Sequence, residues 1–207
     1  MLKMGILVSG GGTNLQALID KIDSGYLKGV EIATVVSSSP GAYALERAAK
    51  RGIPHSCIAR RDFSTIEEYT KSMVNHFEKA GVGLIVMAGY ISFAGAELIK
   101  KYENRIINVH PSLIPAFCGK GHYGIKVHEK ALEYGVKVTG ATVHFVNEEY
   151  DSGAIILQKA VEILYDDTPE VLQKRVMEQA EWEILPEAVK LFAEGRLKIE
   201  GRKVRIV

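Results

Sequence analysis

Short apolar runs alternate with longer amphipathic stretches along the first half of the chain. The runs are rich in β-branched residues and have the length of strands. They cover residues 5–9, 30–37, 54–58, 83–88 and 105–109. The stretches between them repeat apolar residues every three or four positions, which favours helices. These helices are predicted at 14–24, 42–51, 64–80 and 92–102. Glycines 25, 52 and 81 follow the first three of them and are suited to end a helix.

Residues 83–89, GLIVMAG, are apolar on both faces of the strand they form. Such strands are typical of a parallel sheet that helices cover on each side. Alternation of strands and helices therefore predicts an α/β fold with a doubly wound, mostly parallel sheet. Length favours a single domain over residues 1–207.

The pattern changes after residue 137. Two strands at 138–146 and 154–163 are joined closely, which predicts an antiparallel hairpin attached to the parallel sheet. A long helix follows at 169–194, and we expect Pro186 to kink or split it. Residues 197–207 resemble a small terminal hairpin, so the fold carries an antiparallel C-terminal extension.

The amino-acid composition indicates which kinds of binding partner this chain is expected to have. Lysine and arginine total 26 and aspartate and glutamate total 25, which gives a formal net charge of +1. We therefore expect no nucleic acid or membrane partner. Two cysteines, Cys57 and Cys118, are too few for a disulfide scaffold and favour the cytoplasm. No run approaches the ~20 apolar residues that span a bilayer, and the first apolar run is shorter than a signal-peptide core.

Residues 9–14, SGGGTN, join the first strand to the first helix. Consecutive glycines allow backbone N–H groups to converge on an anion, and the helix N-terminus adds partial positive charge. A phosphate is the expected ligand of such a loop, although an ordinary tight turn has the same composition. The dinucleotide fingerprint would need a glycine where Leu15 stands and an acid after the second strand, where the chain reads SSSP. A phosphomonoester such as a ribose phosphate fits better.

Asn108 and His110 lie two apart at the end of the fifth strand, so they share one face of the sheet. Open α/β sheets bind ligands at the carboxyl ends of their strands, and Pro111 ends this strand. An amide beside an imidazole can stabilise an oxyanion and carry a proton. The alternative is a core histidine that bonds a backbone carbonyl.

A carboxylate partner is expected for His110. Asp151 lies in the connection between the two late strands, and an ionised carboxylate there would raise the pKa of the imidazole. Asp151 also precedes Ser152 and Gly153, where an aspartate often bonds its own turn. Spacing alone leaves both interpretations open.

Five segments resemble the phosphoribosylglycinamide formyltransferases of the folate-dependent formyltransferase superfamily. They read GGGTNLQAL (10–18), VMAGY (86–90), INVHPSLIPAF (107–117), GATVHFVNEEYDSGAIILQ (140–158) and LFAEGRLK (191–198). The resemblance extends from residue 4 to about residue 198, and it implies the Rossmann-like fold of that superfamily. It also implies formyl transfer from 10-formyltetrahydrofolate, as co-substrate, to the amine of 5-phosphoribosylglycinamide in purine biosynthesis.

The resemblance assigns catalytic roles to Asn108, His110 and Asp151, with Pro111 and His144 beside them. His144 alternatively makes a structural hydrogen bond. The implied phosphate and ribose contacts are Gly12, Thr13, Asn14, Leu15, Gln16 and Glu181. The implied folate contacts are Ile91, Ser92, Phe93, Ala94, Asn108 and Val146.

Some positions depart from the better-known members. Ser92 and Ile66 each replace a common arginine on the folate side, and the segment 116–124 is longer than usual. The alignment near the ribose needs a shift of one residue, so Glu178 competes with Glu181.

Other activities remain as alternatives. Formyltetrahydrofolate deformylases have a similar sequence after the catalytic turn. At the turn itself they have HHS, whereas this chain has Val109-His110-Pro111. A formyltransferase acting on another amine and a non-catalytic binding module are further readings. No metal is expected, because Cys118, His122 and His128 match no common zinc spacing. We expect a monomer or a homodimer.

Overall fold

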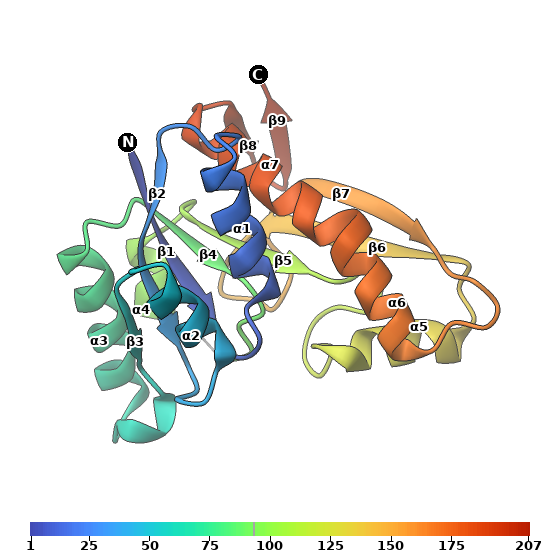
Figure 1. Ribbon diagram of the computed structural model, residues 1–207, viewed down its shortest axis with the longest axis horizontal. Coiled ribbons are helices and arrows are strands. Elements are labelled where there is room, and N and C mark those ends of the chain that lie inside the picture. Colours follow the sequence, from blue (N-terminus) through green and yellow to red (C-terminus); the bar gives the residue numbers. More distant parts are fainter. Residues whose placement is uncertain (93) are drawn as a thin grey trace. The chain divides into compact units, whose positions relative to one another are not determined.

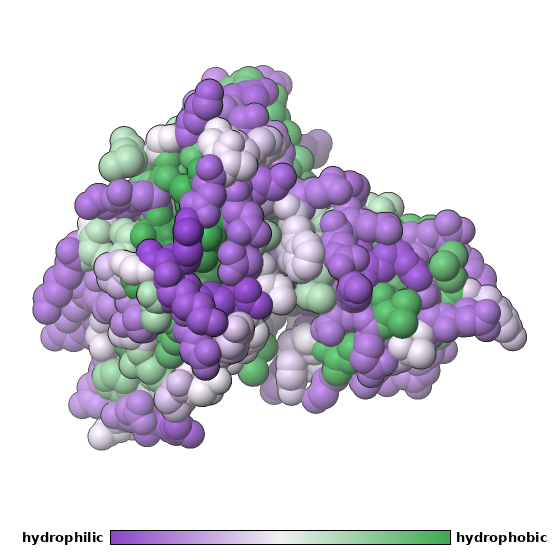
Figure 2. All heavy atoms as spheres, in the orientation of Figure 1, coloured by the Kyte–Doolittle hydropathy of each residue, from purple (hydrophilic) through white to green (hydrophobic). Residues whose placement is uncertain are grey.

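The computed structural model describes residues 1–92 and 94–207 (Figure 1). The chain divides into two compact units, Met1–Ile107 and Asn108–Val207, which are described in turn. The single domain expected over residues 1–207 stays a prediction. Figure 2 shows that the face in view is largely hydrophilic, with apolar side chains in separate patches. None of the described helices combines the length and apolarity that crossing a membrane requires.

The first unit is built on parallel strands. They are β1 (Leu2–Val8), β2 (Val30–Ser37), β3 (His55–Cys57), β4 (Leu84–Met87) and the start of β5 (Ile106–His110). Their order is β3-β2-β1-β4-β5, and β1 pairs in parallel with both β2 and β4. Leu84, Ile85 and Val86 are fully buried, as the two-sided apolar pattern predicts. The strand order thus reverses beside β1, which is the feature that creates a ligand site in doubly wound sheets.

Helices cover this sheet on both sides. They are α1 (Thr13–Asp23), α2 (Tyr43–Lys50), α3 (Ile66–Lys79) and α4 (Ala96–Lys101), with a short 3-10 turn, η1, at Arg60–Asp62. Right-handed crossovers that run in opposite directions from β1 place α1 and α2 on one face and α3 and α4 on the other. Contacts between α1 and α2, and between α3 and α4, agree with this arrangement. A capping box between Thr65 and Glu68 fixes the start of α3.

The second unit continues from the end of β5. Its elements are α5 (Ile125–Tyr134), β6 (Val138–Phe145), β7 (Ile155–Glu162), α6 (Pro169–Val176), the π-helical turn η2 (Met177–Glu181), α7 (Trp182–Ala193), β8 (Leu197–Glu200) and β9 (Lys203–Ile206). The strand order is β5-β6-β7-β9-β8. The pairs β6–β7 and β8–β9 are antiparallel, which confirms both predicted hairpins and with them the α/β class with an antiparallel extension.

Two features of this unit differ from the sequence analysis. Helix α5 was not expected, because its buried residues are only Val127, His128 and Ala131, and a histidine weakens the apolar pattern. The long helix is present, but its α-helical pattern changes at η2, before Pro186, which lies inside α7. π-helical turns are rare and are often found at functional positions.

Candidate active site

The glycine loop of the first unit has the geometry of a phosphate cradle. Gly12 is the N-cap of α1 and has a left-handed backbone, with φ 71°. A Cβ on Gly12 would lie 2.6 Å from the Cβ of Ala44, so both the backbone and the space require glycine. Thr13, Asn14 and Leu15 form the first turn of α1, and the N–H groups of a first helical turn are suited to bind an anion.

The implied phosphate-side residues of α1 differ in burial. Asn14 and Leu15 are buried, whereas Gln16 is half-buried and holds its side chain between Asp20 and Arg47. Gln16 donates to Asp20 over 2.8 Å and accepts from Arg47 over 3.0 Å. Sequence reasoning missed Arg47, which comes from a different helix and has no motif around it.

The implied folate segment follows β4 in the same unit. Ile91 is 64% exposed, and its N–H donates to the hydroxyl of Ser9 over 3.0 Å. Ser92 hydrogen-bonds Tyr90, whose hydroxyl also bonds that of Tyr69. Burial raises the pKa of Tyr90, so this phenol stays neutral. Ala94 is buried, and Phe93 lies outside the described residues.

The second unit brings Asn108, His110, His144 and Asp151 together. Asn108 and His110 end β5, and His144 lies near the end of β6. The Nδ1–H of His144 donates to the carbonyl of Phe145 over 2.8 Å, which leaves Nε2 to accept from the Asn108 amide over 3.2 Å. His144 therefore orients the Asn108 amide, besides its structural bond to Phe145.

His110 is held between a carbonyl and a carboxylate. It is 5% exposed, its Nε2 donates to the carbonyl of Phe117 over 2.9 Å, and its Nδ1 lies 3.7 Å from Oδ2 of Asp151. Burial lowers the pKa of His110, and Asp151 and the Phe117 carbonyl oppose that shift without cancelling it. Asp151 thus acts on His110 in the expected direction, but the net pKa is below the ordinary value because desolvation disfavours the imidazolium.

Asp151 faces both histidines from the turn after β6. Its Oδ1 lies 3.7 Å from Nε2 of His144, and its Oδ2 accepts from the N–H of Gly119 over 2.8 Å. Burial alone would raise the pKa of Asp151, but the two histidines and the Gly119 N–H hold it below the ordinary value. Its own backbone is left-handed, with φ 50°. Asp151 is therefore both a turn residue and a carboxylate partner.

The glycine that follows Asp151 is required by a close approach. A Cβ on Gly153 would lie 1.7 Å from the carbonyl oxygen of Phe145, at the end of β6. Only glycine lets the returning chain pass so near to this strand. The same passage holds Asp151 beside His144, which gives a physical reason for an aspartate and a glycine at this spacing.

A polar network fixes the turn that follows His110 and Pro111. The Thr142 hydroxyl donates to the carbonyl of Ser112 over 2.7 Å and accepts from the N–H of Ile114 over 3.1 Å. Gln158 donates to Thr142 and to the carbonyl of Ile114, each over 3.0 Å. These buried bonds satisfy the backbone of the turn and keep His110 in place. The contributions of Gln158 and Ser112 were missed, because backbone partners leave no signal in the sequence.

The structure separates the two glutamates that competed for the ribose. Glu181 ends η2 and is 6% exposed, whereas Glu178 is exposed and lies 3.8 Å from Lys174. A buried carboxylate on a π-helical turn is the better candidate for a ligand contact. Val146 follows β6 directly and is half-buried.

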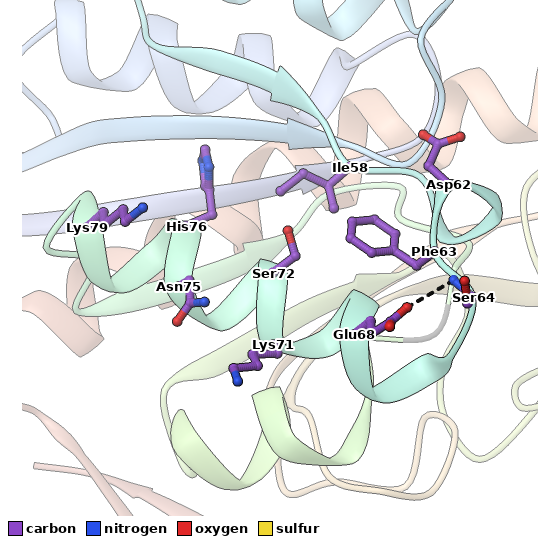
Figure 3. A pocket seen from close by; sticks show the side chains of 10 residues that line it. All are labelled: Ile58, Asp62, Phe63, Ser64, Glu68, Lys71, Ser72, Asn75, His76 and Lys79. Carbon is purple, nitrogen blue, oxygen red and sulfur yellow. Dashed lines mark hydrogen bonds between the residues drawn. The ribbon is translucent and has the colours of Figure 1, made fainter.

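A cavity of about 530 Å³ lies elsewhere in the first unit, between α3 and residues 58–64 (Figure 3). Phe63 and Ile58 form its apolar wall, and Ser72 and His76 extend from α3 toward it. Glu68 lines it too, but its carboxylate caps α3. Of the described residues assigned to catalysis, phosphate or folate, none lines this cavity.

Comparisons with known proteins indicate a group-transfer enzyme. The chain matches the formyl transferase family over residues 2–189, and it belongs to that family. It is 39% identical over 200 residues to a phosphoribosylglycinamide formyltransferase of Haemophilus influenzae, covering 97% of this chain and 91% of the relative.

Solved structures of similar fold include a transformylase and a deformylase. Glycinamide ribonucleotide transformylase 1 from Symbiobacterium toebii is 42% identical, with a TM-score of 0.94, and the match covers 100% of this chain and 94% of that one. A formyltetrahydrofolate deformylase from Pseudomonas syringae is 24% identical, with a TM-score of 0.87 over 99% of this chain and 65% of its own. The latter likeness shows a shared fold.

Proposed function

We propose that this chain transfers the formyl group of 10-formyltetrahydrofolate to the amine of 5-phosphoribosylglycinamide. The observation that carries the proposal is the cluster of Asn108, His110 and Asp151, in which His144 orients the Asn108 amide and Asp151 opposes the effect of burial on His110. The likeness to named formyltransferases over almost the whole chain supports the same substrates.

The reaction is acyl transfer, so negative charge develops on the formyl oxygen. The amine nitrogen forms the new bond to the formyl carbon, and the bond from that carbon to the folate nitrogen breaks. Asn108 supplies an N–H donor, and His144 fixes its orientation because it accepts from the same amide. Donors that are held in place before the reaction lower the barrier without reorganisation.

His110 moves the proton in this scheme. The amine loses a proton and the departing folate nitrogen gains one, and an imidazole suits this exchange at neutral pH. In the structure, Nε2 of His110 donates to the Phe117 carbonyl. To reach the substrate, Nε2 has to give up this carbonyl and donate to the formyl oxygen instead. The negative charge of Asp151 stabilises the positive charge of the imidazolium during this exchange.

The two binding functions are assigned to separate segments. The glycine loop, with Gly12 and the first turn of α1, holds the phosphate, and Glu181 contacts the ribose. The segment with Ile91, Ser92 and Ala94 contacts the folate, together with Val146. No metal takes part, the protein acts in the cytoplasm, and it works as a monomer or a homodimer.

A product assay tests this function. The pure protein is incubated with both substrates, and mass spectrometry is used to look for one added formyl group on the ribonucleotide. Formyl transfer is the expected result. Loss of formyl from the folate to water, with no change in the ribonucleotide, would instead establish a deformylase.

The ribose assignment gives a second test, with a matched control. Glu181→Gln keeps the shape of the side chain but removes its charge, and we expect KM for the ribonucleotide to rise about tenfold, the cost of one hydrogen bond to a charged group. Glu178→Gln removes a carboxylate that faces Lys174, and it should leave KM unchanged. Equal KM values for both variants would reject Glu181 as the ribose contact.

A further inference from the structure

Arg47 of α2 reaches across to the glycine loop. Its Nε donates to the carbonyl of Gly11 over 2.8 Å, and its Nη1 donates to the side-chain oxygen of Gln16 over 3.0 Å. The guanidinium carbon also lies 5.0 Å from the ring centroid of Tyr43. One side chain therefore connects the middle of the loop to the first turns of α1 while it rests on an aromatic face.

A second bond from α2 acts on the preceding peptide. The N–H of Ala44 donates to the carbonyl of Gly10 over 3.1 Å. Two successive carbonyls, of Gly10 and Gly11, thus point toward α2. In a planar trans peptide the N–H points opposite to the carbonyl. The N–H groups of Gly11 and Gly12 are consequently turned away from α2.

This orientation is what an anion cradle requires. Successive N–H groups that face one side, next to a helix N-terminus, form a concave site for a phosphate. Glycine has no side chain to enforce the orientation, so the loop needs an external support. Arg47 supplies it with a planar group whose donors are fixed relative to one another.

Arg47 also contributes positive charge. Among the described residues, no carboxylate lies within ion-pair distance of its guanidinium, whereas Arg51, the C-cap of the same helix, pairs with Asp23. The charge of Arg47 therefore remains available to favour an anion in the loop.

We propose that Arg47 is a positioning residue for the phosphate of the substrate: it holds the Gly11 carbonyl and Gln16 so that the loop amides face the anion. The inference rests on the proposed function, because it takes the loop as the phosphate site. It concerns a residue outside the loop and assigns it no contact with the reacting atoms.

The test compares Arg47→Gln, Arg47→Lys and Arg51→Gln. We expect Arg47→Gln to raise KM for the ribonucleotide about tenfold, the cost of one charge-assisted hydrogen bond, while kcat and KM for the folate stay unchanged. The dissociation constant of inorganic phosphate, measured directly by calorimetry, should rise by the same factor. Arg47→Lys keeps the charge but loses the planar fork, and should recover only part of the affinity.

Arg51→Gln is the matched control. It removes the same charge from the same helix and breaks the tie from α2 to Asp23 at the end of α1, but it leaves the glycine loop untouched. Wild-type KM values are expected. An equal effect of Arg51→Gln, or a fall in the unfolding temperature that accompanies rises in both KM values, would show general loosening and overturn the proposal.

Two other results also overturn it. One is a wild-type KM for the ribonucleotide in Arg47→Gln. The other is full recovery of that KM in Arg47→Lys, which would show that only the charge of Arg47 matters. The phosphate-binding measurement separates this inference from the proposed function. If the wild-type protein forms no formylated ribonucleotide, the proposed reaction fails, while the effect of Arg47 on phosphate affinity is still measured.

Discussion

Replacement of His110 by alanine is expected to lower kcat about a thousandfold, the contribution of a well-placed proton donor. KM for both substrates should change little, since the phosphate and folate segments lie in a different part of the chain. Single-turnover measurements with saturating substrates would show the loss in the chemical step. Full turnover in the variant would remove His110 from the reaction.

The variant His55→Ala serves as a control for the loss of an imidazole. His55 is exposed, and within the described part of the chain its ring bonds only the carbonyl of Ile53, two residues away, so its removal should leave kcat unchanged. A folded His110→Ala protein is recognised by unaltered inhibition by inorganic phosphate. A variant that neither binds phosphate nor unfolds cooperatively would report a folding defect, and His110→Asn would then replace it.

Replacement of Asp151 by asparagine is expected to lower kcat about a hundredfold at neutral pH and to change the pH profile. Burial already lowers the pKa of His110, and the carboxylate opposes this shift. Without the carboxylate the pKa falls further. Because the proposed donor is the imidazolium, activity is lost as the pH rises through that pKa. The alkaline limb of the kcat profile should therefore move to lower pH.

Glu148→Gln provides the comparison for this profile. Glu148 lies in the same connection as Asp151 and is exposed, so its neutralisation changes the net charge equally and leaves the pair with His110 intact. Its pH profile should match that of the wild type. An alkaline limb that stays in place in Asp151→Asn would show that this carboxylate does not set the protonation of His110.

Local periodicity was sufficient to predict much of this fold. In the first unit β4 is a continuous apolar run, and α3 begins with the capping residues Thr65 and Glu68. Asn108 and His110 could be paired from a spacing of two, because a strand alternates its side chains. The antiparallel hairpins were predictable for the same local reason.

The partners of these residues depend on contacts between distant segments. His144 reaches Asn108 from another strand, and the carbonyl of Phe117 reaches His110 from a loop. A backbone carbonyl is common to every residue, so no composition marks it. Arg47 likewise gains its role from the path of the glycine loop. The sequence indicated which groups are candidates for the chemistry but not which groups hold them in place.

The antiparallel C-terminal extension also bears on association between copies of this protein. In the second unit, β9 pairs beside β7 at Ile155, and the outermost strand, β8, is four residues long with exposed Lys198 and Glu200. Short edge strands with outward charges are poor templates for another chain. The terminal hairpin thus covers β7 at its first residue, Ile155, and hinders intermolecular strand addition at that end of the strand.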